Sequence, residues 1–153
     1  MIIILEGPDG SGKSTLAERL AKQTGYILMH RTKPNSDEEK KNMMAEYLQV
    51  IKSGKNVIFD RCWYSEMVYG PVMRDETIIT YPDMFELEKL LCRRGAILIY
   101  CTDKPDVLWE RCRARGEDYI TDILTHTKIC EGYEELMGVP HLIPVVRYGY
   151  EDL

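Results

Sequence analysis

The sequence lacks any apolar run long enough to cross a membrane. Its longest runs, such as residues 96–101, are far shorter than the ~20 residues that a spanning helix requires. No basic stretch precedes the apolar residues Ile2–Leu5, so we expect no signal peptide. The five cysteines are odd in number and include no C-x-x-C pair, which favours reduced thiols. Together these absences predict a cytoplasmic protein with no membrane partner.

The sequence also lacks an excess of positive charge. It carries 25 Asp and Glu residues against 20 Lys and Arg residues, a net charge of −5. Proteins that bind duplex nucleic acid need clustered positive charge against the phosphates, so we expect no duplex nucleic acid as a partner. A small basic pocket for an anion is compatible with this balance. No internal repeat, low-complexity tract or linker divides the chain, which predicts a single domain over residues 1–153.

Five short apolar segments recur along the chain, with helical patterns between them. Near-continuous apolar runs of this length are typical of strands buried on both faces of a parallel sheet. Their alternation with helices predicts βαβ units, and hence an α/β fold with a five-stranded parallel sheet flanked by helices. Pro144 should place the last strand at an edge, because proline donates no hydrogen bond to a neighbouring strand. The predicted strands are Ile2–Leu5, Tyr26–Met29, Val57–Phe59, Ile97–Tyr100 and Leu142–Val146.

Helix start and stop signals lie between these strands. Ser36 followed by acidic residues is a typical N-cap, and Gly54 is a typical stop. Asp83 begins a second helical pattern, and Pro105 suits the first turn of a third. These signals, with the periodicity of the apolar residues, predict helices over residues 37–53, 83–94, 106–113 and 121–137.

The first predicted strand leads directly into a glycine-rich segment that satisfies G-x-x-x-x-G-K-[ST] and precedes a helical pattern. Its glycines allow successive backbone N–H groups to surround phosphate oxygens, and the helix N-terminus adds partial positive charge. Lys13 supplies a mobile charge to the phosphates, and the Ser14 hydroxyl is placed to bind Mg²⁺. The alternative is a turn that binds nothing, and the flanking strand and helix argue against it. The predicted ATP-binding residues are Gly7, Asp9, Gly10, Ser11, Gly12, Lys13, Ser14 and Thr15.

Asp60 and Arg61 follow the third predicted strand. In open α/β sheets ligands bind at the carboxyl ends of the strands, so Asp60 should face the phosphate loop. A carboxylate there can hold Mg²⁺ through its water ligands, and Arg61 can bind a second phosphate with two hydrogen bonds. The alternative is a purely structural Asp–Arg pair, which the neighbouring phosphate loop makes less favourable.

The ordered set of motifs resembles that of thymidylate kinases. Residues 5–15 resemble the E-G-x-D-G-x-G-K-[ST]-T loop of that family, and residues 60–74 resemble its D-R-x-x-x-S-x-x-x-Y segment with a later Arg. Residues 103–117 resemble its lid, and residues 131–136 resemble the aromatic-bearing helix after the lid. The resemblance covers the chain to about residue 137. It implies a three-layer P-loop kinase fold with a short Arg-rich lid over about residues 111–120.

The resemblance also implies roles for the matching residues. Asp9 would lie near the 3′-hydroxyl of the acceptor, and Tyr69 would lie near its sugar or base. Because the family's P-loop arginine is absent here, the catalytic arginine would come from the lid. The predicted catalytic residues are Lys13, Arg111, Arg113 and Arg115, and the predicted metal ligands are Ser14 and Asp60. The predicted acceptor-binding residues are Asp9, Arg31, Arg61, Tyr64, Tyr69 and Arg74, of which Tyr64 either stacks on a base or packs in the core.

The segment after the second predicted strand bears on the acceptor. It contains two cations, Arg31 and Lys33, and no carboxylate. A monophosphate acceptor needs positive charge and no general base, whereas a hydroxyl acceptor needs a carboxylate to take its proton. The segment therefore favours a nucleoside monophosphate as the small-molecule acceptor. Thymine is not implied, because residues 70–71 (Gly-Pro) replace the Gln that follows the tyrosine in thymidylate kinases.

Two other functions stay open at this point. One is a deoxynucleoside kinase, or a kinase of a hydroxymethylated pyrimidine that is free or in DNA, with Asp9 or Asp60 as the general base. The other is a non-catalytic nucleotide-binding or switch protein. The run of lid arginines argues against it, since a sensor needs no charge placed to meet a transition state. The resemblance further suggests a homodimer, because thymidylate kinases are commonly dimers.

Overall fold

The computed structural model describes residues 1–30, 36–117 and 119–149. Within these residues the strands form one parallel sheet of order β2-β3-β1-β4-β5, with β1 at its centre. The carboxyl ends of all its strands therefore meet at the same edge, where open α/β sheets bind ligands. The strands are β1 (Ile2–Glu6), β2 (Ile27–His30), β3 (Val57–Asp60), β4 (Ile97–Thr102) and β5 (Val145–Gly149).

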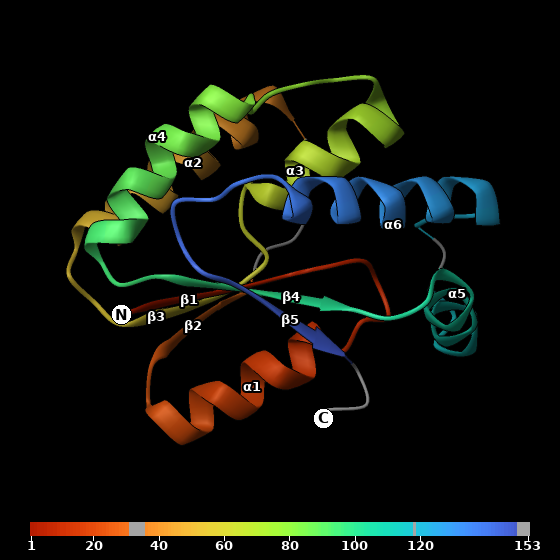
Figure 1. The fold of residues 1–153 in the computed structure, drawn as a ribbon, viewed down its shortest axis with the longest axis horizontal. Helices are drawn as coiled ribbons and strands as arrows, with labels where there is room; N and C mark the ends of the chain where they lie inside the picture. Colours follow the sequence, from red (N-terminus) through yellow and green to blue (C-terminus); the bar gives the residue numbers. More distant parts are fainter. Residues whose placement is uncertain (31–35, 118, 150–153) are drawn as a thin grey trace.

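Helices cover both faces of this sheet (Figure 1). The helix α1 (Lys13–Thr24) lies on one face, and a larger group of helices lies on the other. That group comprises α2 (Asp37–Lys52), α3 (Tyr64–Tyr69), α4 (Tyr81–Arg93) and α6 (Ile123–Gly138). A π-helical turn, η1 (Gly70–Arg74), follows α3, and α5 (Pro105–Ala114) lies beyond the carboxyl end of β4. The predicted three-layer α/β fold is confirmed.

The core holds the ends of β1 and β3 in place. All of β1 is buried, as its uninterrupted apolar sequence predicts. On the face with more helices, the ring of Tyr47 meets the rings of Phe59 and Trp63 edge-on, with centroid distances of 5.3 and 5.5 Å. On the other face, Leu16 and Ala17 of α1 pack against the sheet. Burial of these apolar side chains is the main favourable contribution to folding, and it fixes where the loops after the strands begin.

The predicted strands are found, with shifts at their ends. The largest shift is in the last strand, which spans Val145–Gly149 rather than the predicted Leu142–Val146. Pro144 has no N–H to donate, and its carbonyl accepts a hydrogen bond from the Leu98 N–H at 2.9 Å just before β5 begins. Among the described strands β5 pairs with β4 alone, so the predicted edge position is confirmed.

The helix starts follow their capping residues. The Ser36 hydroxyl accepts a hydrogen bond from the Glu39 N–H at 3.2 Å, which confirms the predicted start of α2. The helix α4 begins at Tyr81 and not at Asp83, because Thr80 is the N-cap and Asp83 closes its capping box. Residues 64–74 form α3 and η1, although the sequence predicts no helix there. These short helical turns depend on contacts with distant residues that the local sequence does not reveal.

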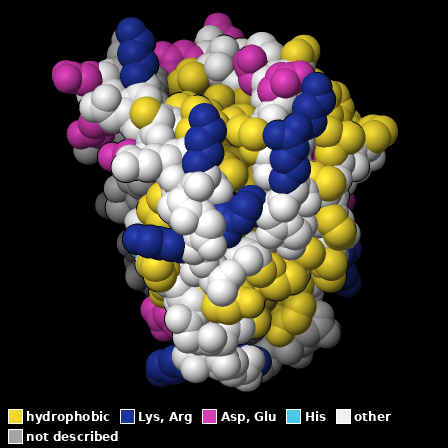
Figure 2. Space-filling view, turned by 90° about the vertical axis from the view of Figure 1, so that its left-hand side faces the viewer, with side chains coloured by type: hydrophobic (Ala, Val, Ile, Leu, Met, Phe, Trp, Pro, Cys, Tyr) yellow, Lys and Arg dark blue, Asp and Glu magenta, His cyan; other side chains and the backbone are white. Residues whose placement is uncertain are grey.

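Basic side chains are not confined to the predicted phosphate-binding edge. Figure 2 shows the side of the molecule where the strands begin, and several Lys and Arg side chains lie there among uncharged and hydrophobic ones. Some of the basic residues have structural roles, as Arg94 donates a hydrogen bond to the Lys55 carbonyl at 2.5 Å.

Of the helices in the described residues, none is both long and apolar enough to span a membrane.

Candidate active site

The loop between β1 and α1 surrounds a space suited to phosphate. The backbone of Gly7 has φ 153°, and a Cβ there would lie 1.9 Å from the Cys101 carbonyl oxygen, so only glycine fits. Gly10, at φ 83°, approaches α5 so closely that a Cβ would lie 2.9 Å from the Leu108 carbonyl oxygen. These two positions let the loop fold tightly between β4 and α5, with α1 starting directly behind it at Lys13.

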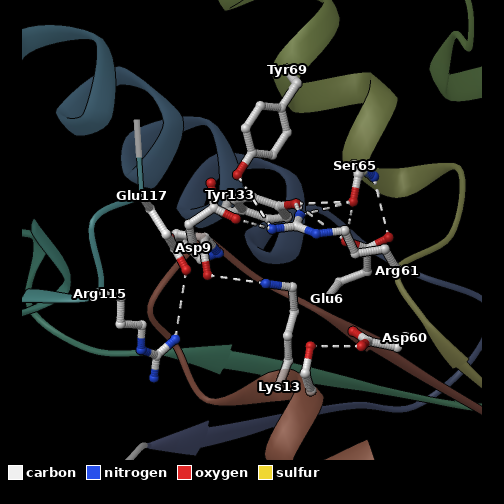
Figure 3. Close-up of polar contacts among 12 residues, drawn as sticks. Glu6, Asp9, Lys13, Asp60, Arg61, Ser65, Tyr69, Arg115, Glu117 and Tyr133 are labelled. Atoms are coloured by element: carbon white, nitrogen blue, oxygen red, sulfur yellow. Dashed lines mark hydrogen bonds and ion pairs between the residues drawn. The ribbon is translucent and has the colours of Figure 1, made fainter. Parts of the chain in front are cut away.

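The polar groups of this loop fit a bound anion. The Ser11 hydroxyl is buried and has no hydrogen-bond partner among the residues that the structure describes. The Lys13 side chain is buried, and its Nζ lies 3.4 Å from the Pro8 carbonyl oxygen. Burial, together with the nearby Arg61 charge, lowers the pKa of Lys13 to about 8. The Asp9 carboxylate lies beside this amine (Figure 3), and a phosphate group would add further counter-charge and accept a bond from the Ser11 hydroxyl, so the residues present fit a nucleotide phosphate.

Oxygen ligands for a divalent cation lie beside the loop. The Ser14 hydroxyl donates a hydrogen bond to Asp60 Oδ2 at 2.7 Å, which brings the end of β3 to the start of α1. The His30 ring Nδ1 lies 2.5 Å from the same carboxylate oxygen. No group of three or more His, Cys, Asp and Glu side chains able to hold a metal occurs in the described part of the chain. A single carboxylate and a hydroxyl fit Mg²⁺, which is bound by one or two carboxylates together with substrate phosphates.

Arg61 stands where β3 meets the phosphate loop (Figure 3). Its backbone has φ 71°, a left-handed conformation that non-glycine residues adopt rarely and mostly at functional sites. Its Nη2 donates to Asp9 Oδ1 at 2.5 Å, and its Nη1 donates to the Tyr133 hydroxyl at 3.1 Å. Burial alone would raise the pKa of Asp9, but the charges of Arg61 and Lys13 outweigh it and hold that pKa below its usual value. Asp9 is therefore ionised and fixed toward Arg61.

Glu6, at the end of β1, is a buried residue that the sequence analysis did not assign to the site. Its Oε1 accepts hydrogen bonds from the Cys62 and Ser65 N–H groups at 2.7 and 3.2 Å, and these bonds hold the start of α3 against β1. Its Oε2 accepts bonds from the Ser65 hydroxyl at 2.6 Å and the Tyr133 hydroxyl at 3.2 Å. Burial raises the pKa of Glu6 despite the opposing charge of Arg61. The signal in the sequence is a carboxylate that ends an otherwise apolar buried strand.

A cavity of about 370 Å³ opens next to Arg61 and extends below the predicted lid. This volume is within the range of small-molecule sites, which is about 300–1,000 Å³. Tyr69 and Tyr119 lie on it with their rings roughly parallel and their centroids 6.3 Å apart. The remaining lining residues come from α2, α3, η1, α5, α6 and the lid, and they include Met43, Tyr47, Glu66, Arg74, Trp109, Arg113, Glu117 and His126.

The lid arginines lie in different settings. Arg111 pairs with Asp103 at 2.9 Å. Arg113 lies 4.3 Å from the ring centroid of Trp109 and donates to the Ile120 carbonyl at 2.8 Å, so it anchors the lid. The side chain of Arg115 is 45% exposed and lies 3.8 Å from Glu117, near Asp9 (Figure 3). Of the three arginines, Arg115 has the side chain that is held least by contacts within the protein.

The structure brings most of the predicted site residues together, and it places Arg74 and Tyr64 in contacts with other partners. The loop residues, Asp60, Arg61 and Tyr69 converge on one region at the carboxyl edge of the sheet. Arg74 lines the cavity but pairs with Glu66 at 2.5 Å and not with the phosphate loop. Tyr64 is fully buried, and its hydroxyl donates to Glu88 at 2.7 Å, so the structure places it in the core and not in the cavity. Arg31 lies outside the described residues.

Two relatives, one of them with a solved structure, are similar to this chain over most of its length. The SPbeta prophage-derived uncharacterized protein YorR of Bacillus subtilis is 33% identical over 139 residues, which cover 90% of this chain and 82% of YorR. The crystal structure of YorR in complex with phosphorylated GDP has a TM-score of 0.80 at 27% identity, covering 99% of this chain and 86% of that chain. A thymidylate kinase of Leptospira borgpetersenii is 29% identical over 153 residues, covering 77% of this chain and 71% of the relative.

Two further matches concern the fold and the family. The crystal structure of polyphosphate kinase 2 from Arthrobacter aurescens has a TM-score of 0.75 at 17% identity, and the match covers 99% of this chain and 62% of that chain. At this identity the likeness shows the fold. The profile of the family "Polyphosphate kinase 2 (PPK2)" matches residues 1–119, from the phosphate loop to the lid. The chain therefore belongs to the PPK2 family and is a divergent kinase of the P-loop nucleotide kinase type.

Proposed function

We propose that this kinase transfers the terminal phosphoryl group of ATP to the phosphate of a nucleoside monophosphate. The observation that carries the proposal is the position of Arg61 between two sites. It is bonded to Asp9 of the phosphate loop, and it lines the cavity beside Tyr69. A guanidinium at this junction suits an acceptor phosphate that faces the nucleotide held by the loop. Phosphoryl transfer needs this kind of positioning and charge neutralisation more than covalent chemistry.

Each side chain then has a defined task. Lys13 and the backbone N–H groups of the loop bind the donor phosphates, and Arg61 orients the acceptor phosphate. Ser14 and Asp60 would hold Mg²⁺, which neutralises charge on the phosphates when bound. Arg115, from the lid, is the side chain we assign to the charge that develops on the transferred group. Trp109 and the lid residues anchored by Arg113 help to exclude water from the cavity.

The acceptor is proposed to be a monophosphate because, in the part of the chain that the structure describes, the carboxylates beside Arg61 are held in internal contacts and are not poised as a general base. Asp9 is ionised but bonded to Arg61, and Glu6 is enclosed by the donors of Cys62, Ser65 and Tyr133. A phosphate oxygen is already anionic and needs no base, whereas a hydroxyl acceptor does. The names of the relatives support a nucleotide acceptor, since one is a thymidylate kinase and the YorR structure contains phosphorylated GDP.

Transfer can be tested by incubating the protein with ATP, Mg²⁺ and single acceptors, and by separating the products chromatographically. The panel is dTMP, dUMP, dCMP, dAMP, dGMP, 5-hydroxymethyl-dUMP and thymidine. We expect a diphosphate product, and we expect Lys13→Met to lower kcat at least about 100-fold because the donor phosphates lose their charge partner. Lys22→Met, in the last turn of the same helix, is the matched control and should retain activity. Turnover of thymidine alone would contradict the proposal, and ATP binding without transfer would support a switch protein.

Polyphosphate is a second candidate for the phosphoryl donor. The observation that favours it is the match of the PPK2 family over residues 1–119. The same assay decides between the donors when polyphosphate replaces ATP, at equal phosphate concentration and with the same acceptors. Faster turnover with polyphosphate would reassign the donor site and leave the acceptor proposal intact, because the two substrates occupy different parts of the site.

A further inference from the structure

Arg61 and Arg74 both line the cavity, and their surroundings differ. Arg61 is bonded to Asp9 of the phosphate loop at 2.5 Å. Arg74 Nη2 donates to Glu66 Oε2 at 2.5 Å, and its Nε lies 3.4 Å from Glu76 Oε2. The two guanidinium groups therefore have separate carboxylate partners. The resemblance to thymidylate kinases placed both arginines at the acceptor phosphate, and these contacts separate their roles.

The charge around Arg74 is unsuited to a phosphate. One guanidinium stands between two carboxylates, Glu66 and Glu76, so the local charge sums to about −1 at neutral pH. A dianionic phosphate would be repelled by this pair, whereas Arg61 can receive it beside Lys13. The Glu66 side chain is only 6% exposed and lines the cavity, and a carboxylate that accepts one bond from Arg74 can accept further bonds from other donors. A neutral ligand with donors on its edge could supply these further bonds.

The structure also provides surfaces on which a base can lie. The rings of Tyr69 and Tyr119 face the cavity, and Tyr47 and Met43 line it from α2. Aromatic side chains stack on any nucleobase and so contribute affinity without selecting one. Selection depends on the polar groups, which in this wall of the cavity are the Glu66 carboxylate and the Arg74 guanidinium.

We propose that Glu66 and Arg74 recognise the Watson–Crick edge of guanine, which makes a guanine nucleoside monophosphate the preferred acceptor. This inference rests on the proposed function, because it takes the cavity as the acceptor site. Guanine presents one acceptor, O6, followed by two adjacent donors, N1–H and the 2-amino group. An arginine next to a carboxylate presents one donor followed by two acceptors, which is the complementary order. Hydrogen bonds to ionised groups are the stronger kind, so the selection should be large.

The other bases fit this order less well. Thymine would direct its O2 acceptor at the carboxylate, and two acceptors in contact repel each other. Cytosine and adenine each offer one amino donor beside a ring nitrogen that accepts, so one carboxylate oxygen would be left without a donor. A site built around a buried polar group rejects ligands that leave this group unpaired by much more than it rejects a change of size.

The 2-amino group of guanine provides the sharpest test. Hypoxanthine nucleotides lack this group and are otherwise the same, so dissociation constants for dGMP and dIMP isolate one hydrogen bond to Glu66. We expect the wild-type protein to bind dGMP about 10- to 100-fold more tightly than dIMP, as for a bond to a charged acceptor. It should also bind dGMP more tightly than dTMP, dCMP or dAMP. Isothermal titration calorimetry, or the fluorescence of the protein's aromatic side chains, measures these dissociation constants in the absence of ATP.

Two variants separate recognition from general electrostatics. Glu66→Gln keeps the size of the side chain but replaces one acceptor with a donor, so the ratio of dIMP to dGMP dissociation constants should fall to about 1–3. Glu76→Gln is the matched control, because it removes the other carboxylate beside Arg74 from a residue that does not line this cavity. The ratio should stay at its wild-type value in that variant. Thermal unfolding of both variants shows whether either has lost its fold.

Each outcome has a definite meaning. Equal binding of dGMP and dIMP by the wild-type protein would overturn the assignment, and this result needs no variant to fold. Tighter binding of dTMP, dCMP or dAMP than of dGMP would also overturn it, as would an unchanged ratio in Glu66→Gln. Failure of the proposed function appears separately, as selective binding of dGMP with no transfer of phosphate from either donor. That result would support the proposed recognition of guanine, and it would contradict the proposed transfer of phosphate to a nucleoside monophosphate.

Discussion

In the proposed function, Arg61 is the side chain that joins the donor site and the acceptor site. Its left-handed backbone is a strained conformation that costs about 1–3 kcal/mol in general, so its surroundings must hold it there. The bonds from its guanidinium to Asp9, Ser65 and Tyr133 do so, and Glu6 in turn fixes Ser65 and Tyr133. The site is therefore organised by a buried network that extends from β1 to α6.

The hydroxyl of Tyr133 tests this network at the residue scale. Tyr133→Phe removes one bond to Arg61 and one to Glu6, so the acceptor phosphate should be held less well. We expect the KM for the monophosphate to rise about 5- to 20-fold, with a smaller change in the KM for ATP. Steady-state kinetics with each substrate varied in turn measures both.

Tyr100→Phe is the control for that variant. Tyr100 stacks on Tyr133 with centroids 6.1 Å apart, and its hydroxyl donates to Glu134, outside the network. Its removal should leave both KM values within about twofold of the wild type. A similar rise in the acceptor KM for both variants would indicate a general loss of packing. It would contradict the prediction that the Tyr133 hydroxyl positions Arg61.

At the scale of elements, we propose that α5 and the lid divide structural and catalytic roles among their arginines. Gly10 brings the phosphate loop into contact with α5, and Arg113 ties the lid down through the Glu117 and Ile120 carbonyls. Arg115, at the C-cap of α5, stays partly exposed above the loop. A helix that rests on the loop thus sets the position from which Arg115 can reach a transferred phosphoryl group.

Alanine substitutions in the lid should separate these two tasks. Arg115→Ala should lower kcat at least about 100-fold with little change in the unfolding temperature, because an exposed cation is lost from the reacting charge. Arg113→Ala should lower the unfolding temperature, because the lid loses two hydrogen bonds and a contact with Trp109. Kinetics together with thermal melting checks both. A kcat loss confined to Arg113→Ala would contradict the assignment of Arg115.

At the scale of the whole molecule, a buried ion pair connects α4 to the segment after α6. His141 Nδ1 lies 2.8 Å from Glu88 Oε2, and Glu88 also accepts bonds from the Tyr64 hydroxyl and the Leu142 N–H. Burial alone would raise the pKa of Glu88, but these hydrogen bonds outweigh it and lower the pKa. Burial would likewise lower the pKa of His141, and its bond to Glu88 outweighs that and raises the pKa. The pair is therefore charged over a limited range of pH.

Stability should follow the titration of this pair. The contribution of His141 is complete below its unfolded pKa of about 6.5 and is lost as the pH rises through the higher folded value. The contribution of Glu88 is complete above its unfolded pKa of about 4.5 and is lost as the pH falls through the lower folded value. We expect the pair to stabilise the fold most between about pH 4.5 and 6.5. Denaturant unfolding across pH 4–9 measures it.

The variant Glu88→Gln should flatten that profile and lower the unfolding free energy by about 3 kcal/mol, because His141 loses its buried counter-charge. An unchanged pH profile in this variant would show that other groups control the pH dependence.

The homodimer, the single domain over residues 1–153 and the cytoplasmic location stay predictions.

The order of residues along the chain already specified the fold class, and it predicted the donor site. Apolar runs interrupted by helical patterns specify a parallel sheet because burial on two faces requires them, and the loop motif is contiguous, so its chemistry is local. The proposed acceptor side depends on contacts that no local pattern predicts: Glu6 reaches Tyr133, 127 residues away, and Arg74 meets Glu66 through a π-helical turn. Only the tertiary structure could assign Tyr64 to the core and distinguish Arg61 from Arg74. Which carboxylate neutralises which cation is decided by packing between elements.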